Sequence, residues 1–548
     1  MRSEVIRVYK TVHTWAGIVA GMALFIAFYA GALTIFKEPL SRWVSPPNAG
    51  VSAVPLQDTP ALIRQLLIEH PEAAKDFHVY LQQAEHIPAR IGWEVREASG
   101  ADHDHAHGQH YIATLSTDGA PLFSEAEPAQ LAEFIDVLHR VVGLPFDNDP
   151  NRWFMGVIAM LYALALISGI VILLPSLLKD LFALRLGHNI KRMWRDAHNV
   201  VGVFSLPFHV IMAVTAAVFA FHDGIYALQN TLIHDGQISK VFSPPRDSST
   251  SPKPPDPSTM LSPEQLLARV HELSPSFKPE SMQFLRVTTP GAMVRVWGHD
   301  PAAISPRFQG GFVVLNPYTG RTLNADNLPG QQDAAFTTLG AFFGLHFGTF
   351  GGTPVQWLYF VLGMAGAWLF YSGNLLWVES RRRSQRQFGD GAAQRRDVTL
   401  MAAATVGICL GAVIGISVTI VSGKWLHGHV DHLDDWYRYV YYSVFFASIA
   451  WAFAAGGARA SVHLLWLAAA STLAIPLTTL MAWLLPVLGL WANTSVASLG
   501  VDATALLGGI CFIWMASATS RRVWFGTADS VWSARKPAIT SSANADIA

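Results

Sequence analysis

Eight stretches of the chain are long and apolar enough to cross a bilayer as helices. A spanning helix needs about 20 mostly apolar residues, because the hydrocarbon core is about 30 Å thick. The stretches that meet this requirement are, approximately, 14–36, 153–175, 199–221, 354–378, 398–421, 437–456, 461–486 and 501–519. The whole chain is 51% hydrophobic and only 14% charged, which is too apolar for an ordinary soluble protein. The sequence therefore predicts a polytopic α-helical membrane protein with about eight spans.

Basic residues gather in the connections after the second and fourth stretches, near the N-terminus and in the C-terminal tail. Segments rich in Lys and Arg stay on the cytoplasmic side of a membrane. The residues concerned include Arg7, Lys10, Lys179, Arg185, Lys191, Arg192, Arg195, Arg381, Arg382, Arg383, Arg386, Arg395, Arg396, Arg521 and Arg522. The pattern predicts that both termini are cytoplasmic.

Two long polar segments, 45–138 and 223–345, then lie outside the cytoplasm. Each begins with a helical pattern and continues with strand-like alternation and a Gly-containing turn, at 116–122 and at 316–323. Each segment is therefore predicted to form a small α+β domain. The predicted order is first span (1–44), outer domain 1 (45–138), spans two and three (139–222), outer domain 2 (223–345), span four (346–385) and four additional C-terminal spans (386–548).

The first 380 residues contain an internal duplication of helix, outer domain and helix. Aligning His13 with His198 also aligns Gly17 with Gly202, and spans two and four share a Ser-Gly pair at 168–169 and 372–373. Duplicated membrane units commonly place their site at the interface between the copies.

Four histidines occupy matching positions in the two copies. His13 and His198 both begin an H-x-x-x-G sequence near spans one and three, and His139 and His346 both follow a leucine shortly before spans two and four. Ionisable groups are costly at these positions and are expected to serve a function. Neutral imidazole is a good iron ligand, and two imidazoles on facing helices hold a b-type haem. We expect one haem b at each membrane face, two in all.

Any such haem is expected to be non-covalent. Cys409 and Cys511, the only cysteines, lie in apolar runs and form no C-x-x-C-H attachment sequence. The alternative for each single histidine is an interfacial residue bonded to a carbonyl or a lipid headgroup, but the duplication favours the haem interpretation.

His209 is a further candidate ligand. It follows His198 by eleven residues, which on one continuous helix places it about 20° from the same face and about 16 Å deeper. It is either an outer ligand, in place of His139 or His346, or a core histidine bonded to a neighbouring helix.

A histidine tract in the first outer segment is a weaker candidate metal site. Its members are His103, His105, His107 and His110. Imidazoles bind iron, copper, nickel or zinc, but the spacing matches no specific site, and a solvated loop is the alternative.

Several motifs resemble the PepSY-associated transmembrane family. They are the H-x-x-x-G at His13, LHR at 138–140, DAHNVVGVFSLPFH at 196–209 and LHFG at 345–348. The resemblance covers about residues 1–385. Within this family, the arrangement is similar to that of iron-regulated bacterial inner-membrane proteins and ferrisiderophore reductases, which contain haem. It implies extracytoplasmic PepSY-like domains and an oxidoreductase. Fusion members of that family carry a flavin reductase domain, whereas this chain ends in four more spans.

The leading hypothesis is a di-haem reductase that passes electrons across the membrane to ferric iron, bound by a siderophore or another chelate. The electron donor is unknown, a quinol or a cytoplasmic reductant, since no nucleotide-binding motif is present. The partners expected are this chelate, the donor and membrane lipid, with no nucleic acid. One alternative is a PepSY sensor or peptidase-regulating protein without redox activity. Another is a metal transporter, although spans five to eight offer only His463 and Asp502 as candidate ligands.

Overall fold

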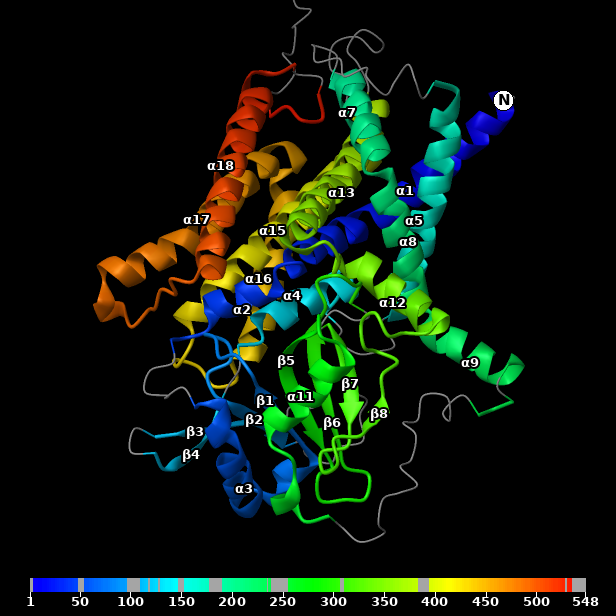
Figure 1. Ribbon diagram of the computed structural model, residues 1–548. Coiled ribbons are helices and arrows are strands. Elements are labelled where there is room, and N and C mark those ends of the chain that lie inside the picture. Colours follow the sequence, from blue (N-terminus) through cyan, green and yellow to red (C-terminus); the bar gives the residue numbers. More distant parts are fainter. Residues whose placement is uncertain are drawn as a thin grey trace, which may run out of the picture.

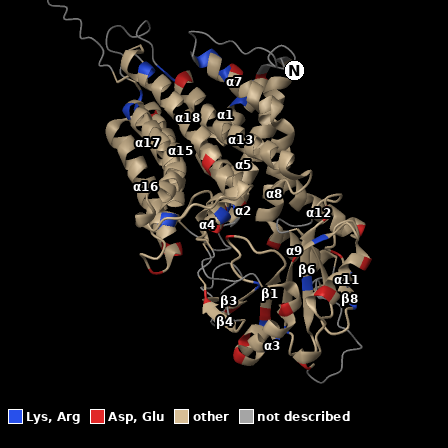
Figure 2. Ribbon diagram, turned by 60° about the vertical axis from the view of Figure 1, so that its left-hand side comes forward, with Lys and Arg blue, Asp and Glu red and all other residues tan. Residues whose placement is uncertain are grey.

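The computed structural model describes residues 3–47, 54–95, 109–116, 119–126, 129–145, 152–176, 190–233, 235–237, 255–305, 310–382, 394–527 and 530–534. Long helices form one part of the molecule, and one β-sheet with its own short helices lies at one end of them (Figure 1). We call this end of the helices the sheet side. Several Lys and Arg residues lie at the opposite ends of the helices (Figure 2).

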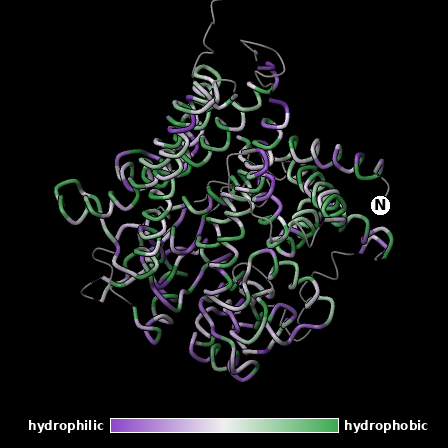
Figure 3. Tube along the Cα trace, turned by 90° about the horizontal axis from the view of Figure 1, so that it is seen from above, coloured by the Kyte–Doolittle hydropathy of each residue, from purple (hydrophilic) through white to green (hydrophobic). Residues whose placement is uncertain are grey.

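The long helices make this a multi-pass membrane protein. Six described helices have the length and hydropathy of spans: α1 (Ser3–Thr34), α5 (Arg152–Leu173), α13 (Gly352–Ser380), α15 (Arg396–Trp425), α17 (Gly457–Leu484) and α18 (Val496–Phe525). Their hydrophobic character is visible along the Cα trace in Figure 3. The bent pair α7 (Ile190–Phe204) and α8 (Leu206–Ala220) counts as a seventh if it is one span. The predicted span 437–456 coincides with α16 (Leu433–Ala455), which is not among these six helices, so eight spans remains a prediction.

The third predicted span is not a straight helix. α7 and α8 meet at an angle of 69°, at Ser205, and Pro207 occupies the first turn of α8. Proline has no N–H to continue the helical hydrogen-bond ladder. The prediction that His198 and His209 share one face of a continuous helix is therefore wrong, because the break lies between them.

The two copies of the duplication pack against each other with approximate two-fold symmetry. α1 contacts both α5 and α13, and its counterpart α7–α8 likewise contacts both. In each copy one short helix precedes the second long helix. It is α4 (Leu131–Arg140) before α5 and α12 (Ala334–Phe347) before α13. α4 packs on α1 as α12 packs on α8. The symmetry brings equivalent residues of the two copies together.

The two polar segments share one antiparallel sheet. Its eight strands have the order β4-β3-β2-β1-β5-β6-β7-β8. Their bounds are β1 (Asp76–Tyr80), β2 (Ile91–Val95), β3 (Gln109–Leu115), β4 (Pro121–Glu125), β5 (Lys278–Leu285), β6 (Met293–His299), β7 (Gly311–Leu315) and β8 (Thr322–Asn324). The helices α3 (Thr59–Glu69) and α11 (Pro263–Leu273) contribute to the same apolar core as the strands. Each segment thus forms the helix and strands predicted for it.

The β1–β5 pairing joins the two segments at their centre. Phe77 lies opposite Phe284 in the register, and their rings stack at 4.8 Å with an interplanar angle of 1°. An aromatic pair of this kind contributes about 0.5–1.5 kcal/mol beyond the area it buries. The pairing joins the strands of both segments into one continuous sheet.

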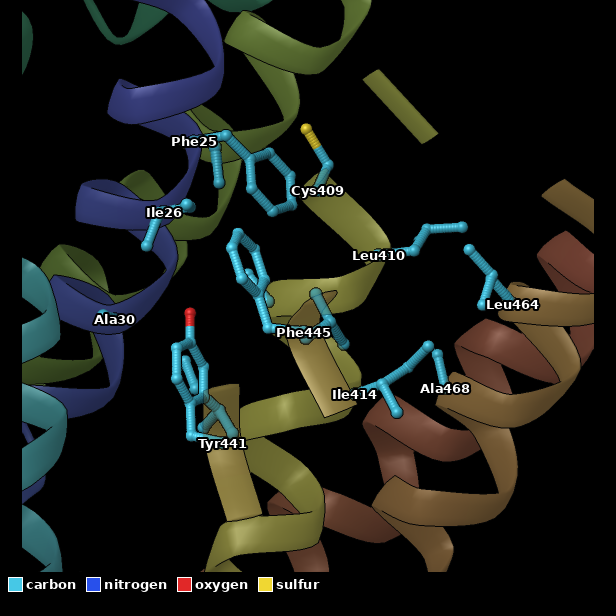
Figure 4. Close-up of a cluster of buried hydrophobic side chains, with 14 of the residues drawn as sticks. Phe25, Ile26, Ala30, Cys409, Leu410, Ile414, Tyr441, Phe445, Leu464 and Ala468 are labelled. Carbon is cyan, nitrogen blue, oxygen red and sulfur yellow. The ribbon is translucent and has the colours of Figure 1, made fainter. Parts of the chain in front are cut away.

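The C-terminal helices attach to the duplicated part mainly through α15. This helix contacts α1, α13, α16 and α17, and 78% of its most apolar window is buried, against 17% for α18. Figure 4 shows Phe25 of α1 among Cys409 of α15 and Tyr441 and Phe445 of α16. α18 is therefore the most peripheral of these spans.

Two further helices complete the described α-helices. They are the short helix α2 (Lys37–Val44) and the helix α9 (His222–Leu232), which has no buried residue.

Candidate functional site: paired histidines between the two copies

The four histidines form two pairs, each with one member from each copy. His13 of α1 faces His198 of α7, with ring centroids 6.4 Å apart and an interplanar angle of 81°. His139 of α4 faces His346 of α12 at 6.1 Å and 44°. We call the first the far pair and the second the sheet-side pair. Along α1, His13 is fourteen residues from Ala27, which His139 contacts, so the pairs are separated by about 21 Å along the helix axis.

In the first copy, each histidine is anchored by a backbone carbonyl. His13 Nδ1 donates to the Ala165 carbonyl at 2.9 Å, and His139 Nδ1 donates to the Ala27 carbonyl at 2.7 Å. A carbonyl oxygen only accepts hydrogen bonds, so Nδ1 carries the proton in both rings. The Nε2 atom of each then presents its lone pair.

In the second copy, each histidine is anchored by a hydroxyl instead. His198 Nδ1 lies 3.0 Å from Ser372 Oγ, which itself donates to the Leu369 carbonyl at 2.9 Å. His346 Nδ1 lies 2.7 Å from Thr215 Oγ1, which donates to the Ile211 carbonyl at 2.6 Å. Because both hydroxyl protons are already committed, both oxygens accept from the histidines. We therefore assign the same tautomer to all four rings.

Glycines make room for three of these rings. An added Cβ at Gly31 would lie 2.7 Å from His139 Nδ1, and one at Gly169 would lie 3.1 Å from His13 Cε1. At Gly373 the equivalent distance to His198 Cε1 is 3.5 Å. The repeated Ser-Gly pair is thereby explained in part: its glycine lets a ring lie close to the helix backbone in both copies.

The pairs fit bis-imidazole binding of an iron porphyrin. A metal–imidazole bond of about 2.0 Å and about 1.1 Å from nitrogen to ring centre predict centroids about 6.2 Å apart across an iron, close to the values in both pairs. Anchoring of the remote ring nitrogen is also the usual arrangement for a ligating histidine. Beside the sheet-side pair lies a cavity with about 710 Å³ of empty volume, its open mouth included, lined mainly by apolar groups, among them Phe28, Met212 and Phe347. This lining suits a macrocycle.

His209 lies apart from both pairs, within an aromatic cluster. Its Nδ1 is 2.5 Å from the Tyr162 hydroxyl, and its ring packs against Phe28, Phe208 and Phe370. Among the described residues, its buried Nε2 has no hydrogen-bond partner. The structure brings His139 to His346 and places His209 with these aromatic rings between α1, α5 and α13. The ligand role of His209 stays a prediction.

A second, larger space lies between the membrane helices and the sheet. It has about 5860 Å³ of empty volume, its open mouth included, and we call it the chamber. The strands contribute His78, Arg295 and Trp297 to its lining, and Phe347 lines both the chamber and the cavity of the sheet-side pair. Burial lowers the pKa of His78 and of His86, another lining residue, so both imidazoles are neutral at pH 7. The chamber thus offers polar and aromatic groups next to the sheet-side pair.

The histidine tract is mostly outside the described residues. His103, His105 and His107 fall there, whereas His110 lies on β3 opposite Glu94 of β2. Within the described part of the chain, no group of three or more His, Cys, Asp or Glu side chains could hold a metal ion. The tract therefore stays a prediction.

Sequence reasoning missed a buried polar group on the sheet side of the C-terminal helices. Lys424 is 2% exposed; its ammonium lies 3.8 Å from the centre of the Trp43 ring and donates to the Trp491 carbonyl at 3.0 Å. Asp502 accepts from the Trp43 indole at 2.9 Å and from Thr479 at 3.0 Å. These contacts fasten α2 to α15 and α18. A lysine at the end of an apolar run was the sequence signal that could have revealed them.

A haem held by the far pair would be bound more weakly if the hydroxyl anchor of His198 were removed. In Ser372→Ala, His198 Nδ1 loses its acceptor, and loss of such a partner typically costs about tenfold to a hundredfold in metal affinity. We expect faster haem loss to apomyoglobin and a shifted midpoint potential for the far pair alone. Ser448→Ala is the control, because the buried Ser448 hydroxyl donates to the Val444 carbonyl of its own helix, α16, at 2.8 Å. Equal behaviour of the two variants would contradict the anchoring role.

Comparison with known proteins gives one family. The family described as PepSY-associated TM region matches residues 10–380, which is the duplicated part with both histidine pairs. No curated protein matches the chain.

Proposed function

The chain belongs to the PepSY-associated transmembrane family, and we propose that it is a haem-containing membrane reductase that delivers electrons to a ferric chelate on the sheet side. The proposal rests on the two pairs of facing histidines. Each of the four rings is anchored at Nδ1, which leaves Nε2 to bind iron.

Haem b bound at each pair would supply reversible one-electron chemistry between ferric and ferrous iron. His13 and His198 would hold one group, and His139 and His346 the other. The anchoring carbonyls and hydroxyls would keep each imidazole neutral and oriented, and would so set its strength as a ligand. Apolar and aromatic side chains around His209 occupy the level between the pairs.

The proposed orientation places the sheet in the periplasm. Eight crossings of the bacterial inner membrane, with α16 as the additional span, put both termini in the cytoplasm, and basic residues such as Arg195 and Arg382 then lie on the cytoplasmic side. The far pair is in that case the electron entry, and the sheet-side pair faces the chamber.

The chamber is the proposed binding place of the ferric chelate. One electron reduces Fe³⁺ to Fe²⁺, and the donor, a quinol or a cytoplasmic reductant, supplies one electron for each iron. Siderophores enclose iron in hard anionic oxygen ligands, which hold the less charged ferrous ion more weakly. Release of iron outside the cytoplasm follows from the reduction.

Visible spectroscopy and anaerobic stopped-flow measurements test the proposal. The detergent-purified protein should show a low-spin b-type spectrum with about two haems per chain, and the dithionite-reduced form should be reoxidised by a ferric hydroxamate while a ferrous chelator traps the product. A protein without haem would overturn the proposal and favour a sensor or peptidase-regulating protein. Haem that a ferric chelate does not reoxidise would reject the substrate.

The transporter alternative receives less support. Asp502, one of its two candidate ligands, has one carboxylate oxygen engaged by Trp43 and Thr479. The other, His463 of α17, lies beside Trp451 of α16, with 3.3 Å between the His463 Nδ1 and the Trp451 indole nitrogen. We infer no ion path from these residues.

A further inference from the structure

The chamber continues into the membrane layer as a groove along one face of α18. The lining residues of α18 recur at the spacing of a single helix face; they include Gly500, Val501, Thr504, Gly508, Cys511 and Met515. From Gly500 to Met515 this face extends about 22 Å. The other wall comes from α1, α13, α15 and α17. The groove therefore runs deep into the bilayer while remaining continuous with the chamber.

The groove suits hydrocarbon rather than ions. None of the described residues that line its membrane part is charged. Its hydroxyls are engaged within the protein: Ser417 Oγ and Thr472 Oγ1 are 3.2 Å apart, and Thr504 donates to the Gly500 carbonyl at 2.7 Å. An ion in the groove would lose its hydration without gaining ligands, whereas an apolar chain would lose nothing.

The chamber at the outer end of the groove has the opposite character. Lys278, Glu280, Arg295 and His78 supply charges and hydrogen-bonding groups there. One molecule that fills both spaces needs a polar head and a long apolar chain. Its head would lie beside Phe347, next to the sheet-side pair, in the place where the proposed reduction occurs. A structural phospholipid in that position would block the substrate.

We propose that the natural substrate is an acylated ferric chelate, whose iron-binding head occupies the chamber and whose acyl chain lies in the groove along α18. The inference rests on the proposed function and narrows its substrate class. The ferric ion gains one electron and no covalent bond of the chelate changes. On this account, α15, α17 and α18 supply the walls that hold the chain.

Binding of gallium chelates tests the inference separately from electron transfer. Gallium(III) has the charge of ferric iron but is not reduced. The probes are a trihydroxamate with a tetradecanoyl chain and the same trihydroxamate with an acetyl group, both loaded with gallium. Their affinities are measured by calorimetry with the full chain in phospholipid nanodiscs, where partitioning into lipid is the same for every variant.

Two glycines allow the groove to be filled without disturbing α18. A Cβ at Gly500 meets no atom within 4 Å, and one at Gly508 lies 3.6 Å from Thr472 Cγ2. Leucine also favours a helix more than glycine does. In Gly500→Leu/Gly508→Leu we expect about tenfold weaker binding of the tetradecanoyl probe, since loss of two buried methylenes already has that effect, and unchanged binding of the acetyl probe. Ala503→Leu adds three carbons on the exposed face of α18, outside the groove, and should bind both probes as the wild type does.

The outcomes separate the inference from the proposed function. Equal affinity of the wild type and the filled variant for the tetradecanoyl probe would overturn the acyl-chain inference, even if ferric chelates reoxidise the haem. Phospholipid retained by the wild type and lost from the filled variant, with unchanged probe affinity, would also overturn it and identify the occupant as lipid. Failure of both ferric chelates to reoxidise the haem would reject the proposed function itself.

Discussion

Replacing His139 with alanine should lower the haem content of the purified protein by about half, because one of two bis-histidine sites loses an axial ligand. His346→Ala should remove the same haem, whereas His13→Ala and His198→Ala should each remove the other. The measurement is pyridine haemochrome content per chain, together with redox titration to identify the remaining component. The pairing of ring centroids across the two copies sets this expectation.

Double variants sharpen the result. His139→Ala/His346→Ala should retain as much haem as either single variant, since both changes affect one site, while His13→Ala/His139→Ala should retain almost none. His110→Ala, on β3 away from both pairs, is the control and should keep the wild-type content. Full occupancy in His139→Ala would rule out its ligand role and leave His209 as the remaining candidate on this side.

The histidine pairs were accessible from sequence because duplication gives the same signal twice. His13 and His198 share a local motif, and so do His139 and His346. The predicted topology then places His13 with His198 on one side of the membrane and His139 with His346 on the other. Their anchors were less accessible: Ser372 and Thr215 each lie more than a hundred residues from the histidine they contact, and hydroxyl side chains in apolar helices usually bond to their own helix.

Two features of the fold depend on tertiary contacts that no local pattern encodes. The β1–β5 pairing links strands about two hundred residues apart, and each strand alone is equally compatible with an edge. The break between α7 and α8 has a local signal, Pro207, but its angle of 69° depends on packing in the bundle. Hydrophobicity predicts where spans lie, and it does not predict how straight they are.

Gly31→Ala should disable the sheet-side site with the smallest possible change. The added Cβ would lie 2.7 Å from His139 Nδ1 and 2.9 Å from Cε1, distances that real Cβ atoms do not adopt. His139 is bonded to the Ala27 carbonyl, on the same helix as Gly31, so the ring cannot yield without losing its anchor and its place opposite His346. We expect loss or a high-spin conversion of one haem, and at least about tenfold slower reoxidation by ferric chelates, the lower limit for loss of such an anchor.

Helix stability cannot explain such a loss. Alanine stabilises a helix by about 1 kcal/mol relative to glycine, so α1 itself should become more stable in Gly31→Ala. Gly224→Ala is the control, because a Cβ at Gly224 of α9 meets no atom within 4 Å and α9 carries none of the four paired histidines, so both haems should remain. An unchanged spectrum in Gly31→Ala would mean that His139 does not lie against α1 in the haem-bound protein. The structure would then explain haem binding at the far pair but not at the sheet-side pair.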